Sequence, residues 1–448
     1  MSNPYLEGNF APVTTETTAE DLPVTGSIPR HLDGRYLRIG PNPIAPADPA
    51  TYHWFLGDGM AHGVRIVDGA AKWYRSRYVR SGEVAQALGE ARPPGPTHGD
   101  FDFSPNTNIV GHAGRTFAIV EGGSLPYELT DELATIGACD FDGTLPGGYT
   151  AHPHRDARTG ELHAVSYYWG WGNKVQYSVL GNDGRINRTV DIDCSGSPMM
   201  HDFSLTERHV VIYDLPVSLD LDVVAASDGT RYSATGFPYR WNPDYPARVG
   251  TFSRDGDGSD LKWYDVDPCY VFHALNAYDD GDDIVLDVVR HPKMFATEVR
   301  GPDEGASTLD RWTIDTRGGK VLESRLDDRS QEFPRIDERR AGQRHRYGYA
   351  VGFNDATAPH GVIKHDLQTG ASISHDFGDS RQAGEFVFVA SENGATEDDG
   401  VVMGYVYDRA NDTSDLVVLD AATLERVASV HLPVRVPHGF HGNWVPTA

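Results

Sequence analysis

Cysteine is scarce in this chain of 448 residues: only Cys139, Cys194 and Cys269 occur, and no two of them form a C-x-x-C pair. Neither a disulfide framework nor a thiolate zinc site is therefore expected. Long apolar runs are also missing, because no segment approaches the roughly 18 to 20 apolar residues that a membrane-spanning helix needs. The first ten residues lack the basic and apolar regions of a secretory signal. We therefore expect a cytoplasmic protein.

Positive charge is in deficit, with 39 Lys and Arg residues against 65 Asp and Glu residues and a formal net charge of -26. Such a surface repels nucleic-acid phosphates and anionic lipids, so we expect no nucleic-acid partner. Nothing in the sequence indicates an obligatory protein partner. A G-x-S-x-G elbow, a Walker A loop and a dinucleotide fingerprint are also absent, which argues against hydrolase, nucleotidase and dehydrogenase functions.

Helical periodicity is rare, and Gly82–Ala91 is the best candidate helix. Forty-eight glycines and 28 prolines instead separate short runs rich in Val, Ile, Tyr and Phe, which is typical of strands and turns. We predict an all-β fold in one continuous unit, 1–448, because no Pro/Ser-rich hinge divides the chain. A closed propeller or barrel would remove exposed sheet edges. No internal repeat demonstrates a propeller. The clearest predicted strands are Val175–Leu180, His209–Tyr213, Ile284–Val289, Glu385–Val389, Val401–Tyr407 and Leu416–Leu419.

Histidine is abundant, with 19 residues, and four of these lie at the edges of strand-like runs among aromatic or small apolar neighbours. No local H-E-x-x-H motif occurs, so a metal site would have to be assembled from distant segments. Imidazole suits zinc, copper, nickel and ferrous iron, and the residues alone leave that choice open. A site of two histidines and one carboxylate is a rival, but its H-x-D pattern carries little weight in so Asp-rich a chain. The four histidines are His152, His201, His273 and His441.

At this point the sequence resembles the carotenoid cleavage oxygenases over nearly its whole length. The resemblance rests on motifs that occur in the same order, and it implies a seven-bladed β-propeller with a dome of loops and short helices over an axial Fe(2+) ion. The ligands it implies are the four histidines above, in preference to their neighbours His154 and His438. The motifs are Asn3–Val13, Asp21–Gly26, Gly34–Pro43, His53–His62, Pro105–Val110, Gln331–Asp337 and Phe440–Gly442, together with the histidine contexts.

The resemblance also implies how the ligands are held. Family members orient three of the histidines with glutamates, and the matching residues here are Glu121 for His201, Glu332 for His273 and Glu385 for His441. A carboxylate that accepts the second ring N–H fixes the orientation of an imidazole. The family's ion keeps two adjacent positions open, one for dioxygen and one that is screened by a small side chain matching Thr107.

The reaction implied by the resemblance is oxidative cleavage of a conjugated C=C bond into two carbonyl products, with dioxygen as co-substrate. An apolar tunnel should hold the alkene, and we expect Phe55, Val120, Met199 and Phe272 to line it because they adjoin the iron motifs. Stilbene cleavers typically have a lysine at the position of Val120, so a carotenoid or apocarotenoid is favoured. Long polyenes live in membranes, so we also expect transient docking on a membrane surface.

Three alternatives remain open from the sequence. The first is an enzyme with the same iron centre that cleaves stilbenoid or phenylpropenoid alkenes, such as vinyl or propenyl phenols, to aromatic aldehydes. The second is a propeller that binds or isomerises an apolar ligand without consuming dioxygen. The third is a scaffold propeller without a metal.

Overall fold

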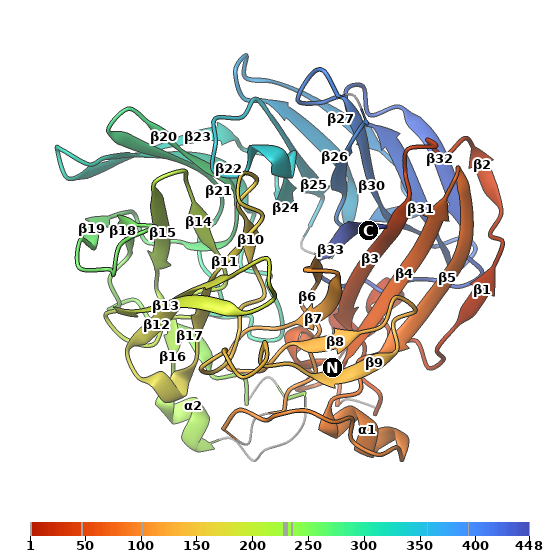
Figure 1. Ribbon diagram of the computed structural model, residues 1–448, viewed down its shortest axis with the longest axis horizontal. Helices are drawn as coiled ribbons and strands as arrows, with labels where there is room; N and C mark the ends of the chain where they lie inside the picture. Colours follow the sequence, from red (N-terminus) through yellow and green to blue (C-terminus); the bar gives the residue numbers. More distant parts are fainter. Residues whose placement is uncertain are drawn as a thin grey trace.

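Seven antiparallel sheets form a closed ring in the computed structural model, and this confirms the predicted seven-bladed β-propeller (Figure 1). The structure describes residues 2–45, 48–99, 102–226, 232–233, 236–355, 357–392 and 394–447. The sheets share no sequence repeat, which is why the number of blades could not be counted from the sequence.

The blades are numbered here in chain order. Blade 1 contains β1 (Thr18–Glu20), β3 (Gly34–Pro41), β4 (Gly59–Val67), β5 (Ala70–Tyr78) and β33 (Gly442–Pro446). Blade 2 contains β6 (Asn108–His112), β7 (Arg115–Ile119), β8 (Tyr127–Leu129) and β9 (Thr135–Ala138). Blade 3 contains β10 (His154–Arg155), β11 (Leu162–Tyr167), β12 (Lys174–Leu180) and β13 (Ile186–Asp193). Blade 4 contains β14 (Phe203–Leu205), β15 (His209–Asp214), β18 (Arg248–Ser253) and β19 (Lys262–Asp265).

The remaining three blades follow the same plan. Blade 5 contains β20 (Tyr270–Asp280), β21 (Asp283–His291), β22 (Thr308–Asp315) and β23 (Lys320–Asp327). Blade 6 contains β24 (Gln331–Arg335), β25 (Tyr347–Phe353), β26 (Pro359–Asp366) and β27 (Ala371–Asp376). Blade 7 contains β2 (Val24–Gly26), β28 (Arg381–Ala383), β29 (Val387–Ala390), β30 (Gly400–Asp408), β31 (Thr413–Asp420) and β32 (Arg426–His431).

The two ends of the chain close the ring at different blades. Strand β33, near the C-terminus, pairs with β3 of blade 1, where Arg38 lies opposite Gly442. Strand β2, near the N-terminus, pairs with β32 of blade 7, where Val24 lies opposite Val430. In Figure 1 the blue strand β33 accordingly lies beside the red strand β3. Such closure satisfies backbone groups that would otherwise form open sheet edges.

Apolar side chains fill the space between neighbouring blades. The largest buried cluster joins residues of blades 3, 4 and 5. Trp312 of β22 is fully buried in it, and its ring centroid lies 6.3 Å from that of Tyr213 in the adjacent blade. This contact packs blades 4 and 5 against each other and so helps to set the angle between them.

Short helices and one small ribbon occupy the connections between strands. The helices are α1 (Gly82–Leu88) and α2 (Leu221–Ala226), and the 3-10 turns are η1 (Pro4–Leu6), η2 (Gly8–Phe10), η3 (Trp54–Leu56), η4 (Trp169–Trp171) and η5 (Glu338–Arg340). The ribbon pairs β16 (Val217–Leu219) with β17 (Tyr239–Trp241). Several of these segments line the large cavity described below, as expected of the predicted dome.

Two predicted elements differ from the structure at their boundaries. Helix α1 ends at Leu88 instead of Ala91, because Gly89 adopts a left-handed conformation (φ 71°) and caps the helix. The strand predicted over Glu385–Val389 begins only at Val387. Strands β28 and β29 both pair with β30, and the chain between them leaves the ladder, so Glu385 is free to turn its carboxylate toward the axis.

Candidate metal centre

The innermost strands of the propeller each deliver one residue of the predicted site. Four of these residues lie just before a strand begins, two lie inside a strand, and Glu385 lies in the break between β28 and β29. The structure thereby brings together residues that the sequence spreads from Thr107 to His441. The assignments are Thr107 before β6, His152 before β10, His201 before β14, His273 in β20, Glu332 in β24, Glu385 before β29 and His441 before β33.

The four histidines converge on one point on the axis. One ring nitrogen from each lies within 4.8 Å of all the others. The Nε2–Nε2 distances are 3.0 Å from His152 to His201, 3.2 Å from His201 to His273 and 3.0 Å from His273 to His441. Two nitrogens bound at right angles to one metal, with bonds of about 2.1 Å, would be about 3.0 Å apart, against about 3.4 Å for tetrahedral ligands. The spacing fits right-angled coordination better.

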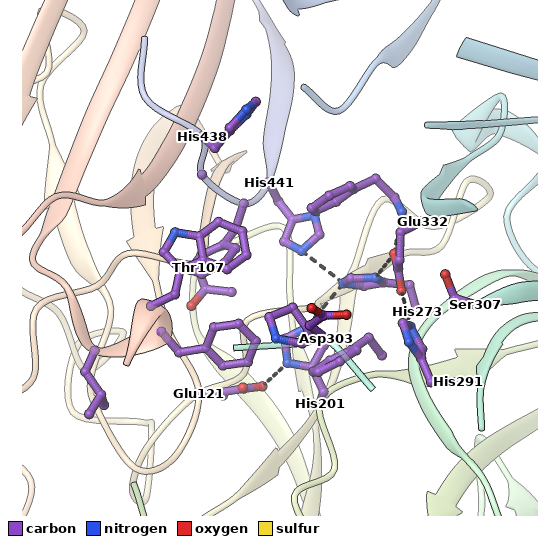
Figure 2. A pocket seen from close by; sticks show the side chains of 18 of the residues that line it. Thr107, Glu121, His201, His273, His291, Asp303, Ser307, Glu332, His438 and His441 are labelled. Carbon is purple, nitrogen blue, oxygen red and sulfur yellow. Dashed lines mark hydrogen bonds and ion pairs between the residues drawn. The ribbon is translucent and has the colours of Figure 1, made fainter. Parts of the chain in front are cut away.

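Three of these imidazoles are held from behind by glutamates, two of which Figure 2 shows. His201 Nδ1–H donates to Glu121 at 2.7 Å, and His273 Nδ1–H donates to Glu332 at 2.6 Å. His441 Nδ1–H donates to Glu385 at 3.0 Å. Glu121 follows β7, the second strand of blade 2, so it approaches the centre from outside the innermost layer.

This donor set requires a cation or extra protons at its centre. An ionised carboxylate can only accept a hydrogen bond, so Nδ1 of each glutamate-bound histidine carries the ring proton. In the neutral imidazole, Nε2 is then a lone-pair acceptor, and such acceptors would repel one another at about 3 Å. A bound metal ion resolves this repulsion, because imidazole Nε2 is an ordinary ligand of zinc, copper, nickel and iron. The residues present therefore fit a metal ion bound by four histidines.

Burial and the neighbouring charges set the protonation of the site. Burial lowers the pKa of His152 well below its ordinary value, and the adjacent imidazoles lower it further. Burial also lowers the pKa of His441 to about 4, although Glu385 opposes this shift. The pKa of Glu385 falls to about 2, because His441 and Arg335 outweigh the opposing effect of burial. These two histidines are thus neutral and these carboxylate oxygens ionised at neutral pH, as metal ligands and their partners must be.

The His273–Glu332 pair behaves differently because its charges are tightly coupled. Burial disfavours both charged forms, yet Glu332 raises the pKa of His273 and His273 lowers the pKa of Glu332. Each partner therefore favours the charged form of the other. A metal ion at Nε2 of His273 would take the place of the second ring proton.

A cavity of about 750 Å³ opens onto the histidine cluster. His201, His273 and His441 reach its surface, and so do Thr107 and Glu121. Its other walls are mainly aromatic or aliphatic, with Phe55, Val120 and Phe272 among the lining residues. Phe55 and Phe272 meet edge to face with ring centroids 5.9 Å apart. The cavity can hold a large apolar ligand against the metal centre.

A second cavity of about 670 Å³ reaches the cluster from another direction. His152, His273 and His441 line it, and about half of its remaining wall is polar or charged, including Arg155 and Asp202. His152 reaches only this cavity and His201 only the apolar one, so the histidine cluster separates an apolar chamber from a more polar one.

Comparison with known proteins places the chain in a family. The model of the family described as retinal pigment epithelial membrane protein matches residues 10–446. A carotenoid cleavage oxygenase of Mycobacterium tuberculosis is 52% identical, over 99% of this chain and 98% of the relative. The chain belongs to the carotenoid cleavage oxygenase family. It is thus an alkene-cleaving oxygenase.

Solved structures agree with this membership. Lignostilbene dioxygenase of Pseudomonas brassicacearum superposes on this oxygenase with a TM-score of 0.88 and 26% identity, covering 99% of each chain. The cobalt-substituted form of the Synechocystis enzyme ACO gives a TM-score of 0.86 and 26% identity, covering 97% of each chain.

Met199 and the two rejected rival histidines lie outside the histidine cluster of this oxygenase. Met199 does not line the apolar cavity and is buried in the core, where its N–H donates to Val217 and its carbonyl accepts from the Tyr270 hydroxyl. The prediction for Met199 is therefore wrong. The rival histidines border the cavities but have other partners: His154 bonds to Asp202 at 2.7 Å and His438 to Gln382 at 3.1 Å.

Other residues of the site were not found from the sequence. His291 Nε2–H donates to the second oxygen of Glu332 at 3.0 Å, so this carboxylate joins two imidazoles (Figure 2). Arg335 lies 3.6 Å from Glu385, whose other oxygen accepts from the Gly442 N–H at 2.8 Å. Nothing in a single sequence marks His291, which belongs to none of the motifs above. Arg335 lies inside the motif Gln331–Asp337, but the motif does not tell that its side chain reaches Glu385.

Neither helix in the described part of the chain has the length and the apolar character that crossing a bilayer would require.

Proposed function

We propose that this chain is an iron(II)-dependent dioxygenase that cleaves one conjugated C=C bond of a carotenoid or apocarotenoid. One oxygen atom of dioxygen would enter each of two carbonyl products, so that the atoms balance without another reactant. The observation that carries the proposal is the cluster of four imidazoles, three held by glutamates, at the end of an apolar cavity of about 750 Å³. We propose that the whole chain, 1–448, acts as one unit.

The protein residues have binding and positioning roles in this proposal. His152, His201, His273 and His441 would hold the iron, and bound iron(II) would supply the activation of dioxygen. Glu121, Glu332 and Glu385 would orient three of the ligands and increase their basicity, and are the further residues we assign to the catalytic machinery. No protein nucleophile or general base is required, so the chain's task is to place one alkene beside the centre.

Thr107 has a defined orientation beside the ligands. Its hydroxyl donates to the side-chain oxygen of Asn106 at 2.9 Å, and its carbonyl accepts from the His441 N–H at 3.0 Å. The hydroxyl proton is thus already used. We propose that Thr107 limits access to one of the open positions on the ion by its bulk, and that it does not exchange a proton with substrate.

The composition of the cavity supports a polyene substrate. Phe55, Val120 and Phe272 give it apolar walls, and Val120 precedes Glu121 where a phenol-binding enzyme would place a lysine. Among the described residues that line this cavity there is no lysine. An extended hydrocarbon would gain free energy by leaving water for such a chamber and would lose little by leaving lipid. A phenolate would find no lysine to pair with its charge.

The surface around the cavity supports transient docking on a membrane. Trp169 and Val224 line the cavity and are 50% and 45% exposed, and Leu221 of α2 is 69% exposed. Exposed apolar side chains at the mouth of a lipophilic cavity would let a substrate pass from lipid without crossing water. We propose a cytoplasmic enzyme that docks on neutral lipid and needs no obligatory protein partner, since the net charge of -26 opposes anionic lipid.

Product identification tests the proposal. Purified protein reconstituted with ferrous iron would be incubated with a long apocarotenal, a hydroxystilbene and a vinylphenol under ¹⁸O₂. We expect two labelled carbonyl fragments from the apocarotenal. Aromatic aldehydes from the phenols alone would favour stilbenoid or phenylpropenoid cleavage instead. Unlabelled products would favour an isomerase.

Metal analysis is the companion measurement. We expect close to one iron per chain in the reconstituted wild type and far less in His273→Ala. If the wild type holds far less than one iron and His273→Ala folds as before, the chain is a scaffold propeller and the oxygenase proposal fails.

A further inference from the structure

His152 lacks the support that the other three histidines have. Within the described part of the chain, no carboxylate hydrogen bond is found for His152, whereas His201, His273 and His441 each donate to a glutamate. Its own backbone N–H donates to the Thr150 hydroxyl at 3.1 Å. A ligand imidazole without a carboxylate partner must take its position from the backbone that carries it.

Asp202 lies where three ligand segments meet. It directly follows His201, and its carboxylate accepts from the Nε2–H of His154 at 2.7 Å. The same carboxylate accepts from the Phe203 N–H at 2.8 Å and from the Ala274 N–H at 3.1 Å. Ala274 is the residue after His273, and His154 is two residues after His152.

The link from His154 to His152 is short and stiff. Pro153 stands between them, and its ring fixes its own φ and restricts the residue before it to extended conformations. His154 also begins β10, where it pairs with His163 of β11. On the other side of the segment, the Asn108 side chain donates to the Ala151 carbonyl at 2.9 Å. A shift of His154 is therefore passed to His152 with little loss.

The environment of Asp202 suits a fixed anchor. The side chain of Asp202 is 3% exposed, while that of His154 is 29% exposed and lines the second cavity. A buried carboxylate with three donors is held rigidly, because losing any one donor leaves a desolvated acceptor without a partner.

We infer that Asp202 is the positioning residue of the metal centre that serves His152: through His154 and Pro153 it holds this histidine in register with His201 and His273. This inference rests on the proposed four-histidine metal site. Asp202 does not belong to the metal-ligand set itself. It acts on the ion only through the segments that it joins.

Metal affinity tests the inference without reference to turnover. Cobalt(II) serves as the probe, because imidazole sites accept it and its visible absorption reports coordination geometry. Titrations of the full-length apoprotein would compare wild type with Asp202→Asn, which keeps the size of the side chain but turns one acceptor oxygen into a donor. Chemical unfolding of each apoprotein would be measured in parallel.

Two His154 variants isolate the link to His152. His154→Ala removes the donor to Asp202, and His154→Gln restores an N–H close to the position of Nε2. Asp214→Asn is the matched control, because Asp214 lies in the same blade, is fully buried and accepts from Tyr245 and Arg248, remote from the centre.

We expect Asp202→Asn to weaken cobalt binding by about 10- to 100-fold and to change the visible spectrum. His154→Ala should also weaken cobalt binding, and His154→Gln should recover most of the lost affinity. Asp214→Asn should lower stability but leave affinity within about twofold. The double variant Asp202→Asn/His154→Ala should bind no worse than Asp202→Asn, because both changes break one path.

The failure of this inference can be told apart from the failure of the proposed function. If wild type binds no cobalt or iron, the metal centre itself is wrong. If wild type binds metal and both Asp202→Asn and His154→Ala bind it equally well with the same spectrum, the positioning role is overturned. If Asp214→Asn weakens binding as much as Asp202→Asn does, the effect is one of general stability, and the inference is also overturned.

Discussion

The backbone N–H of His441 donates to the carbonyl of Thr107 at 3.0 Å, joining residues from two different blades. On its other side, Ile39 exchanges backbone hydrogen bonds with the same loop, accepting from Phe440 and donating to His441. Arg38 also donates to the carbonyls of Pro437 and Phe440. The same hydrogen bonds that bring β33 to the ring therefore also position His441.

A close approach of two glycines makes this closure testable. A Cβ added to Gly439 would lie 2.7 Å from the Cα of Gly40, closer than real side chains come to backbone. Gly439→Ala should push the loop away from β3 and displace His441. We expect a loss of about 1–3 kcal/mol in the free energy of unfolding and a clear fall in metal affinity, measured by cobalt titration.

Gly361→Ala is the control for that effect. A Cβ added to Gly361 would lie 2.3 Å from the carbonyl oxygen of His375. Gly361 lies in β26, which pairs with β27 and holds none of the four histidines. The substitution should cost comparable stability while leaving metal affinity unchanged. Equal loss of affinity in both variants would show that Gly439 has no special part in placing His441.

Removing the metal should lower thermal stability. A ligand that binds only the folded state at about 100 times its Kd stabilises it by about 2.7 kcal/mol. A chelator should therefore lower Tm by a few degrees, and ferrous iron or cobalt should restore it, as followed by differential scanning calorimetry. His441→Ala should show no response to either treatment. A chelator-sensitive Tm in that variant would place the bound metal elsewhere.

The sequence predicted the cluster of four histidines better than its surroundings. The four histidines and three glutamates stand in motifs, and a propeller brings their strands to one axis. Strands such as β30 and β31 were found because their Val-rich runs are bounded by polar turns. Local patterns of this kind predict a strand whatever fold the strand later packs into.

The sequence was least informative where the orientation of a side chain, or its contact with another blade, does not follow from its neighbours in the chain. Met199 precedes His201 by two residues, but this segment is not a strand, so alternation does not tell which way its side chain points. His291 and Asp202 act through contacts between blades, such as the bond from His291 to Glu332. Contacts of this kind depend on the packing angle of whole sheets, which no local pattern contains.

Glu332 should be the most sensitive of the three glutamates. It accepts from both His273 and His291 and also from the Phe333 N–H. In Glu332→Gln, the amide NH2 would face an imidazole N–H, and one of the two hydrogen bonds would be lost. We therefore expect metal affinity to fall by about 10- to 100-fold. Competition with a chelator of known affinity would measure this affinity.

Glu323→Gln is the control for Glu332→Gln. Glu323 lies on β23, an outer strand of blade 5, where it is half-buried and accepts from the Asp267 N–H. An unchanged affinity in Glu332→Gln would mean that His273 is held by the backbone alone.

Phe55 offers a test of the apolar cavity that leaves the metal untouched. Its ring meets those of Phe272 and Phe440 edge to face, at centroid distances of 5.9 and 5.3 Å, and it borders the cavity. Phe55→Ala removes one aromatic contact with an extended polyene, which should weaken the binding free energy of the substrate by roughly 1 kcal/mol. KM should therefore rise several-fold. Metal content should stay at the wild-type level. Phe386→Ala, in a separate core cluster, should lower stability by about 3–5 kcal/mol without altering KM. If Phe55→Ala changes kcat and metal content while KM stays constant, Phe55 supports the centre and does not bind substrate.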